Sequence, residues 1–235
     1  MGPKGLDGII GEYFWGYHAM PAPLLSRDDL LTRLHATFRL HGYEGASMSR
    51  LAAATGLGKA SLYHHFPGGK DQMVDAVLDH VRDRYEAALF RPLETVHPPR
   101  QRLVSMLKTL AQDYDNGARN CLPALLALTP ERDRFAEAIA ALFSRWLDCM
   151  TQLLIDAGLA RDIATRRAHD GVERIQGAIV LSRALGEPKP FVGLMADLPD
   201  QLLAGADRGN IWSSRPTRLP AAPSGFVQTH AARIA

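Results

Sequence analysis

Apolar residues recur at the three- and four-residue spacing of helices along most of the chain. The first run opens at Ser26, with Asp29 three residues later, a pattern like a capping box. Gly42 is predicted to end this helix. No run with the two-residue period of a strand, and no hairpin turn, follows anywhere. The pattern therefore predicts an all-α protein. The inward face of the first helix consists of Leu30, Leu31, Leu34 and Phe38.

Two shorter helices come next, joined by a turn that contains glycine. The first is predicted to begin after Ser47, whose hydroxyl would cap a free backbone N–H, and to end at Gly56. The second begins at Lys59, and its Leu62 and Phe66 are one helical turn apart and face inward. Two short helices in this arrangement form a helix-turn-helix, whose second helix reads DNA in the major groove. The inward face of the first short helix consists of Met48, Leu51, Ala52 and Thr55.

The outward edge of the second short helix carries polar side chains that suit DNA contacts. A cation, a hydroxyl, a phenol and an imidazole are all able to reach base edges or phosphates. Ser47 and Lys70 lie at the starts of the neighbouring helices, where free N–H groups and the helix dipole already favour an anion. The predicted DNA-binding residues are Ser47, Lys59, Ala60, Ser61, Tyr63, His64 and Lys70.

This segment resembles the DNA-binding domain of the TetR/AcrR family of bacterial transcriptional repressors. The matching residues are Ser47, Leu51-Ala52, Gly56-Leu57, the run Leu62-Tyr63-His64-His65-Phe66-Pro67, and Lys70. Two positions depart from the family pattern, because Gly58 stands where the family often has Ser and Ala60 where it often has Gly. The resemblance implies a homodimer that binds a palindromic double-stranded DNA operator. It also implies a small-molecule effector that binds the C-terminal domain and releases the operator.

Charge favours the same location for DNA. Residues 26–70 contain six Lys or Arg side chains against three acidic ones, whereas the whole chain has a net charge of only +2. The positive excess therefore lies on the predicted DNA-binding segment, as a phosphate-facing surface requires.

The remainder of the chain is predicted to form a long connecting helix and a helical body. The connecting helix runs from Lys70 to about Phe90, and His97-Pro98-Pro99 breaks the chain after it. Further helices then extend to about Leu203. We predict a DNA-binding domain at 26–70 and a ligand-binding and dimerisation domain at 71–205. Segments 1–25 and 206–235 are predicted to be disordered, since they lack helical periodicity and are rich in Pro, Gly and polar residues.

Two groups of apolar residues in the body are candidate sites. One group offers more apolar and aromatic side chains than a thin bundle needs, and sites between bundle helices are mostly apolar. Because charge in this part of the chain is balanced, we expect a neutral or weakly charged, largely apolar effector. These residues are Leu103, Leu107, Tyr114, Phe143, Trp146, Met150 and Ile175. The second group would form a large exposed patch on the last two helices, which favours a dimer. These residues are Val172, Ile175, Ile179, Phe191, Leu194 and Leu198.

The apolar runs, the N-terminal segment and the two cysteines indicate the compartment and the redox chemistry of the chain. No uninterrupted apolar run approaches the roughly 20 residues that span a bilayer, so we expect no membrane partner. The N-terminus lacks the pattern of a secretory signal, which predicts a cytoplasmic protein. Cys121 and Cys149 both lie among apolar residues, which favours buried inert thiols, and a redox-sensing role for either is the alternative.

An enzyme and a scaffold are the competing classes. Residues 56–61 nearly match a dinucleotide-binding fingerprint, but no strand precedes them and Ser61 takes the place of the last glycine or alanine. Zinc-protease, nucleophile-elbow and paired-cysteine metal motifs are absent from the sequence. The sequence thus predicts no enzyme, no metal and no cofactor. A helical scaffold without DNA binding, or an activator without small-molecule control, stays an alternative to the repressor.

Overall fold

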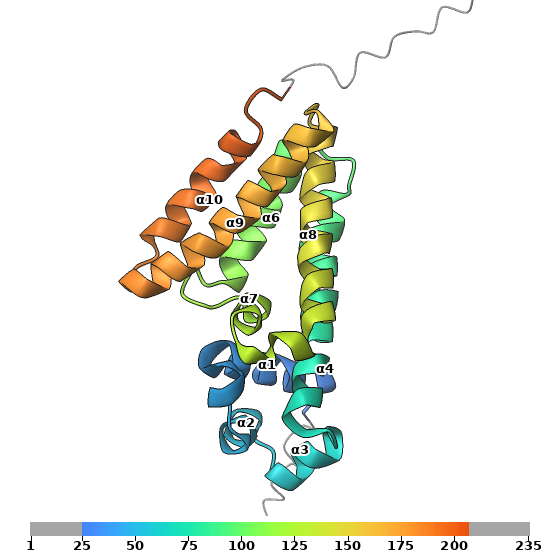
Figure 1. Cartoon of the computed structure of the whole chain (residues 1–235), viewed down its shortest axis with the longest axis vertical. Coiled ribbons are helices and arrows are strands. Elements are labelled where there is room, and N and C mark those ends of the chain that lie inside the picture. The colour runs from blue at the N-terminus through green and yellow to red at the C-terminus, as the bar shows by residue number, and fades with distance from the viewer. Residues whose placement is uncertain (1–24, 207–235) are drawn as a thin grey trace, which may run out of the picture.

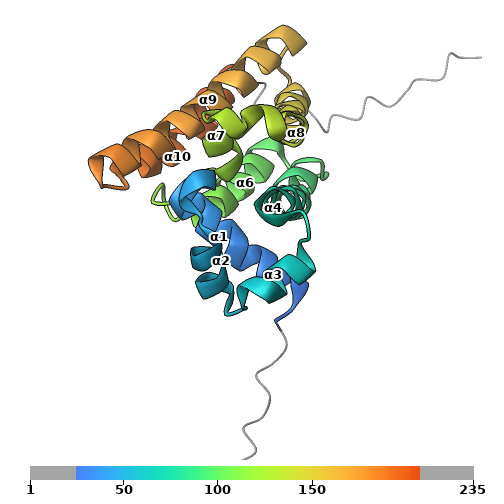
Figure 2. The same ribbon diagram turned by 60° about the horizontal axis from the view of Figure 1, so that its bottom comes forward.

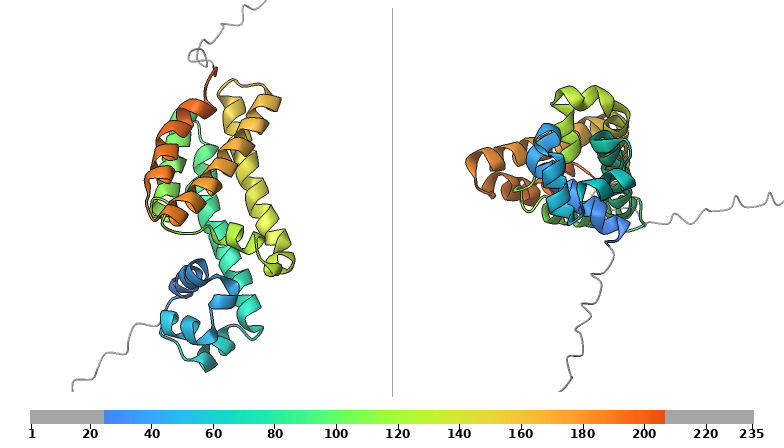
Figure 3. Two further views of the ribbon diagram at one scale, coloured as in Figure 1. Left: turned by 60° about the vertical axis from the view of Figure 1, so that its left-hand side comes forward. Right: turned by 90° about the horizontal axis from the view of Figure 1, so that it is seen from below.

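The computed structural model describes residues 25–206 and is helical throughout, with no strand in that range (Figure 1). The predicted all-α class is confirmed. The predictions of disorder for 1–25 and 206–235 fall almost wholly outside the described residues. A small group of helices lies at one end of the elongated molecule, and a larger helical body lies at the other (Figure 3).

The small end consists of α1 (Arg27–Gly45), α2 (Met48–Thr55) and α3 (Lys59–His65). The Asp29 backbone N–H donates to Ser26 Oγ over 3.0 Å, which confirms the predicted N-cap. Gly42 has φ 67°, a left-handed conformation that favours glycine, and it interrupts α1 without ending it. The predicted inward residues Phe38, Leu51 and Leu62 are fully buried between these helices. Their burial fixes the crossing of α2 and α3 over α1.

A helical column connects the two ends. It comprises α4 (Gly69–Tyr85), a π-helical turn (Glu86–Phe90) and α5 (Arg91–Leu93). This continuous run confirms the helix predicted from Lys70 to Phe90. The column starts beside α3, packs along α1 and continues into the body beside α8 (Figures 1 and 2). Any displacement of α4 therefore reaches the helix-turn-helix directly.

The body contains α6 (Pro99–Asp113), α7 (Leu122–Ala127), a 3₁₀ turn (Pro130–Arg134), α8 (Ala136–Asp156), α9 (Arg161–Leu185) and α10 (Lys189–Leu202). The long α9 packs between α8 and α10 (Figures 1 and 3). The short α7 and the segment before it contact α1, so this part of the body rests on the small end (Figure 2).

Within residues 25–206, one helix, α8, is long and apolar enough to cross a membrane by length and composition. Of its apolar window, 39% is buried inside the protein. Its Leu142, Trp146 and Leu153 side chains are buried in the body, as in the core helix of many globular proteins. One such helix is only weak evidence that the chain crosses a membrane.

The structure corrects the predicted dimer residues. Val172, Ile175, Ile179, Phe191 and Leu198 are buried inside the single chain, and Leu194 is half-buried. Helical periodicity shows that a face is apolar but not which neighbour covers it. Here α8 and α10 cover α9, and α10 packs against α9 and α6. The exposed apolar residues on α9 and α10 are instead Val180, Leu181, Leu185 and Val192.

Candidate nucleic-acid interface and its junction with the body

The turn between α2 and α3 is set by local hydrogen bonds. The Arg50 backbone N–H donates to the Ser47 hydroxyl over 3.4 Å, so Ser47 caps α2 as predicted. Gly56 ends α2 with φ 74°, and its N–H donates to the Ala52 carbonyl. Gly58 precedes α3 without a side-chain cap. Because Gly58 stands where the family often has Ser, no side-chain hydroxyl caps the first N–H groups of α3.

One edge of α3 is free of the protein core. Leu62 is buried and fixes the inner face, while the five predicted DNA contacts on this helix are exposed. Tyr63 is 49% exposed. Donors and acceptors thus lie on the solvent-facing surface of α3, where they are accessible for reading a major groove. The exposed residues are Lys59, Ala60, Ser61, Tyr63 and His64.

Lys70 is less free than the sequence indicates. Its side chain is 22% exposed, and Nζ lies 4.0 Å from the centroid of the Tyr43 ring and 3.8 Å from Glu44 Oε2. A cation–π contact and a carboxylate already compensate part of its charge. Its predicted phosphate contact stays a prediction.

Arg50 was not named as a contact from the sequence. It is exposed on α2, and its Nη1 donates to the Gly45 carbonyl over 2.7 Å. This bond places a guanidinium beside Ser47, the predicted phosphate contact. The sequence did contain an indication of this role, because Arg50 is one of the basic residues that give segment 26–70 its positive charge.

Tyr43 forms one contact between the small end and the body. Its hydroxyl donates to Asp71 Oδ1, and Arg134 from the 3₁₀ turn donates to both Asp71, over 3.0 Å, and Tyr43, over 3.1 Å. Burial, together with this hydrogen bond, raises the pKa of Tyr43 to about 12. No local pattern in the sequence relates Tyr43 to Arg134, because 91 residues separate them.

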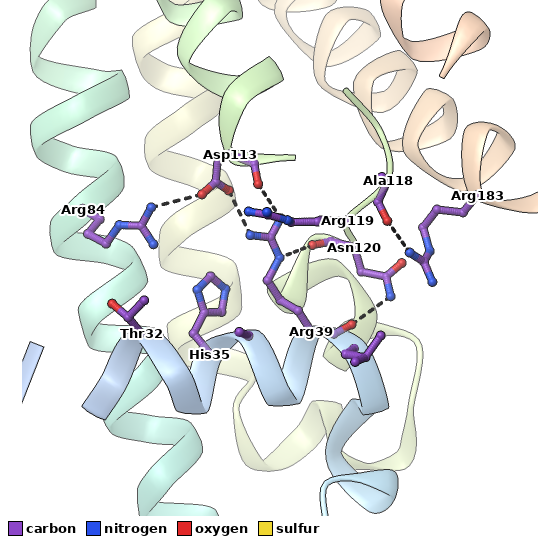
Figure 4. A pocket seen from close by; sticks show the side chains of 11 residues that line it. Thr32, His35, Arg39, Arg84, Asp113, Ala118, Arg119, Asn120 and Arg183 are labelled. Atoms are coloured by element: carbon purple, nitrogen blue, oxygen red, sulfur yellow. Dashed lines mark hydrogen bonds and ion pairs between the residues drawn. The ribbon is translucent and has the colours of Figure 1, made fainter. Parts of the chain in front are cut away.

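Arg39 on α1 forms the second contact, and it is buried. Its Nε donates to the Asn120 carbonyl over 2.6 Å, and Nη2 donates to the Asp113 carbonyl over 3.2 Å (Figure 4). Nη1 lies 3.3 Å from Asp113 Oδ2, and the two side chains are 8% and 11% exposed. Asn120 Nδ2 donates back to the Arg39 carbonyl over 2.9 Å. We call Arg39, Asp113 and Asn120 the junction clamp.

The column helix α4 joins the same clamp. Arg84 Nη2 lies 3.1 Å from Asp113 Oδ1, and the Tyr85 hydroxyl donates to Asp113 Oδ2 over 2.9 Å. One carboxylate therefore holds groups from α1 and α4 against the end of α6. His35, one turn before Arg39 on α1, is 4% exposed beside the clamp. Burial, and then the charge of Arg39, lower the pKa of His35 to about 3, so its imidazole is neutral at pH 7.

The residues predicted as an effector site lie in the interior of the body. Six of them are buried, and Phe143 is half-buried and stacked on Trp146 at a centroid distance of 6.3 Å. The Trp146 Nε1 atom is buried without a hydrogen-bond partner among the described residues. The six buried residues are Leu103, Leu107, Tyr114, Trp146, Met150 and Ile175.

Both cysteines are buried. Burial raises the pKa of the Cys121 thiol, and burial also raises the pKa of Cys149, to about 12. Both thiols are thus protonated at neutral pH and poor nucleophiles.

Comparison with known proteins identifies relatives over both parts of the chain. A family model described as bacterial regulatory proteins, tetR family, matches residues 30–77. A second model, described as the C-terminal domain of LmrA/YxaF-like transcriptional regulators, matches residues 99–196. Together the two models match more than half of the chain.

Individual relatives agree with the family models. The HTH-type transcriptional regulator LmrA of Bacillus subtilis is 25% identical over 183 residues, which cover 75% of this chain and 96% of LmrA. The HTH-type transcriptional repressor AcnR of Corynebacterium efficiens is 35% identical over 91 residues, which cover 39% of this chain and 43% of AcnR. The regulator CifR, solved with 26-base-pair operator DNA, has a similar fold, with a TM-score of 0.60 and 22% identity over 76% of this chain and 97% of that one.

The exposed edge of α3 generates a prediction for Lys59. Lys59→Ala should weaken DNA binding and reduce the slope of log affinity against log salt by about one, because one phosphate neutralisation is lost. The measurement is fluorescence anisotropy with duplex DNA across a salt series. Lys108→Ala removes another exposed lysine, on α6 and away from the helix-turn-helix, and should bind like the parent. A Lys59 variant with the parent's affinity and slope contradicts the assignment.

The neutral His35 leads to a prediction for how the free energy of unfolding depends on pH. The unfolded chain takes up a proton on this histidine near pH 6.5, whereas the folded chain does so only near pH 3. Unfolding free energy should therefore fall as pH drops through this window, by at most about 1.4 kcal/mol per pH unit from this group. In His35→Gln this component should vanish, so urea unfolding of the variant should depend less on pH. Parallel pH profiles for parent and variant would refute a buried neutral imidazole.

Proposed function

Because the chain belongs to the TetR family of bacterial regulatory proteins, we propose that it represses transcription from an operator and releases that operator when a small molecule binds. Its membership makes it a DNA-binding transcriptional regulator. The main support for this proposal is the surface of α3. Its Lys59, Ser61 and Tyr63 side chains are exposed to solvent, while Leu62 is buried in the core. Such a regulator acts in the cytoplasm, where the DNA lies.

Repression is supported by a relative's name, since AcnR is a repressor and matches this chain at 35% identity. An activator without small-molecule control is the second candidate. The DNA contacts of the helix-turn-helix do not distinguish a repressor from an activator, because both need the same contacts.

Operator recognition by this chain requires two copies. A seven-residue α3 reaches few bases, and a two-fold dimer reads two half-sites about one helical turn or more apart. We place the dimer contact on the exposed side of α9 and α10. Four of the exposed large apolar residues in the described range lie there, namely Val180, Leu181, Leu185 and Val192.

Effector control would act through α4. A ligand shifts an equilibrium only by its difference in affinity for the two states, typically about 1–3 kcal/mol. The apolar interior around Trp146 remains our proposal for a largely apolar effector. A hydrogen-bond acceptor on such a ligand would satisfy the unpartnered indole N–H of Trp146. A tilt of α4 would then change the distance between the two α3 helices of a dimer.

Selection of bound fragments from genomic DNA tests the function. We expect enrichment of a sequence with two inverted half-sites, bound with a strong salt dependence. Placing that sequence ahead of a reporter promoter should lower expression when the chain is present. Raised expression would favour the activator. Recovery of unrelated fragments, with no common sequence, would contradict operator binding.

The dimer contact generates a separate prediction. Leu181→Glu places a charge on the exposed side of α9, where Leu181 is 50% exposed, and it should shift the dimer towards monomer. Sedimentation velocity at micromolar concentration measures the mass. Val96→Glu, at a fully exposed loop position, is the matched control and should leave the mass unchanged. A parent chain that sediments as a monomer and still binds the operator rules the dimer out.

A further inference from the structure

A cavity of about 620 Å³ lies at the junction between the DNA-binding end and the body (Figure 4). Residues from α1, α4, the α6–α7 segment and α9 line it. Leu40, which is 67% exposed, and two alanines give it an apolar side. Four arginines give it a charged side, and they are Arg39, Arg84, Arg119 and Arg183. A volume of this size accommodates a small organic molecule.

Positive charge in the cavity exceeds negative charge. Asp113 is the acidic residue among those that line it, and it already serves both Arg39 and Arg84. Arg119 reaches Asp115 over 3.7 Å, where both side chains are 58% exposed, so this pair is weak. The cavity therefore has guanidinium groups whose hydrogen-bonding capacity is only partly used.

Arg183 is the least compensated of the four. Its Nη1 donates to the Ala118 carbonyl, and it makes no ion pair within the described part of the chain. The remaining N–H groups of this guanidinium are free to donate to a ligand at the cavity mouth. A guanidinium binds a carboxylate through two parallel hydrogen bonds, which gives both strength and orientation.

His35 adds a polar group to the wall of the cavity. The residue as a whole is 4% exposed, and its imidazole lines the cavity, where water or a ligand can bond to it. The imidazole is neutral at pH 7 and still offers one N–H donor.

We propose that this junction cavity binds a small organic carboxylate. The carboxylate accepts hydrogen bonds from Arg183 and from the arginines deeper in the cavity, and the apolar part of the ligand contacts Leu40. This assigns an acidic ligand to the junction, a site separate from the apolar interior around Trp146. The net charge of residues 71–235 does not indicate this site. Arg39 comes from α1, whereas the other three arginines come from the body and its connecting helix, and only the fold brings the four together.

The position of the cavity gives the ligand a regulatory role, and this part of the inference rests on the proposed function. A bound anion would contact α1 on the DNA-binding side and α9 on the body side at once. It would therefore favour one arrangement of the two parts over another. By thermodynamic linkage, the anion and the operator then change each other's affinity by the same factor.

Isothermal titration calorimetry of the full chain with phthalate and with succinate tests the site. We expect saturable binding of at least one dianion at millimolar concentration or below, and no binding of the neutral phthalamide. Arg183→Gln should weaken binding about tenfold or more, because charge-assisted hydrogen bonds are lost. Arg91→Gln removes a guanidinium that is 75% exposed on α5, and it should bind like the parent. Absence of dianion binding, or equal binding by Arg183→Gln, overturns the site.

Operator titration with and without the bound dianion tests the regulatory role. A change in operator affinity that is present in the parent and absent in Arg183→Gln supports it. Dianion binding with unchanged operator affinity overturns the regulatory role and leaves the site standing. Failure of the parent to bind any operator without the dianion would instead count against the proposed function, so the two failures are distinguishable.

Discussion

The arrangement of the two ends depends on one buried guanidinium. Arg39 enters the junction from α1 with 8% of its side chain exposed, and a buried charge is stable only when it is paired and fully hydrogen-bonded. The body supplies the Asp113 carboxylate and two backbone carbonyls, while Asn120 returns a hydrogen bond to α1. Because each partner lies on the other side of the junction, separation of the two ends would leave charges buried and unpaired.

The same carboxylate brings the connecting helix into this contact. Arg84 and Tyr85 from α4 both reach Asp113, and the Tyr85 hydroxyl lies 3.3 Å from that of the buried Tyr114 in the body. The three elements that a regulator must coordinate, α1, α4 and α6, thus meet at a single group. A rearrangement inside the body that moves Asp113 changes the position of α4 and the helix-turn-helix together. The charged cavity beside the clamp gives a ligand direct access to this point.

Local patterns in the sequence predicted much of the fold and the DNA-facing edge. Helical spacing located the helices, Ser26 and Ser47 were identified as N-caps, and Leu62 distinguished the inner from the outer edge of α3. Contacts between distant residues were not predictable in this way. Five of the dimer residues proved to be buried because periodicity does not identify the covering helix. Arg39 and Asp113 are 74 residues apart, and only the fold brings their charges together.

A double-mutant cycle between Arg39 and Asp113 measures directly how strongly this pair couples the two ends. Urea unfolding of the parent, Arg39→Met, Asp113→Asn and the double variant gives the interaction free energy of the pair. We expect a favourable coupling of about 1–3 kcal/mol, because the pair is buried and shared between the two ends. Each single variant should also be less stable than the parent. Additive effects, with a coupling near zero, would contradict the claim that this pair holds the DNA-binding end to the body.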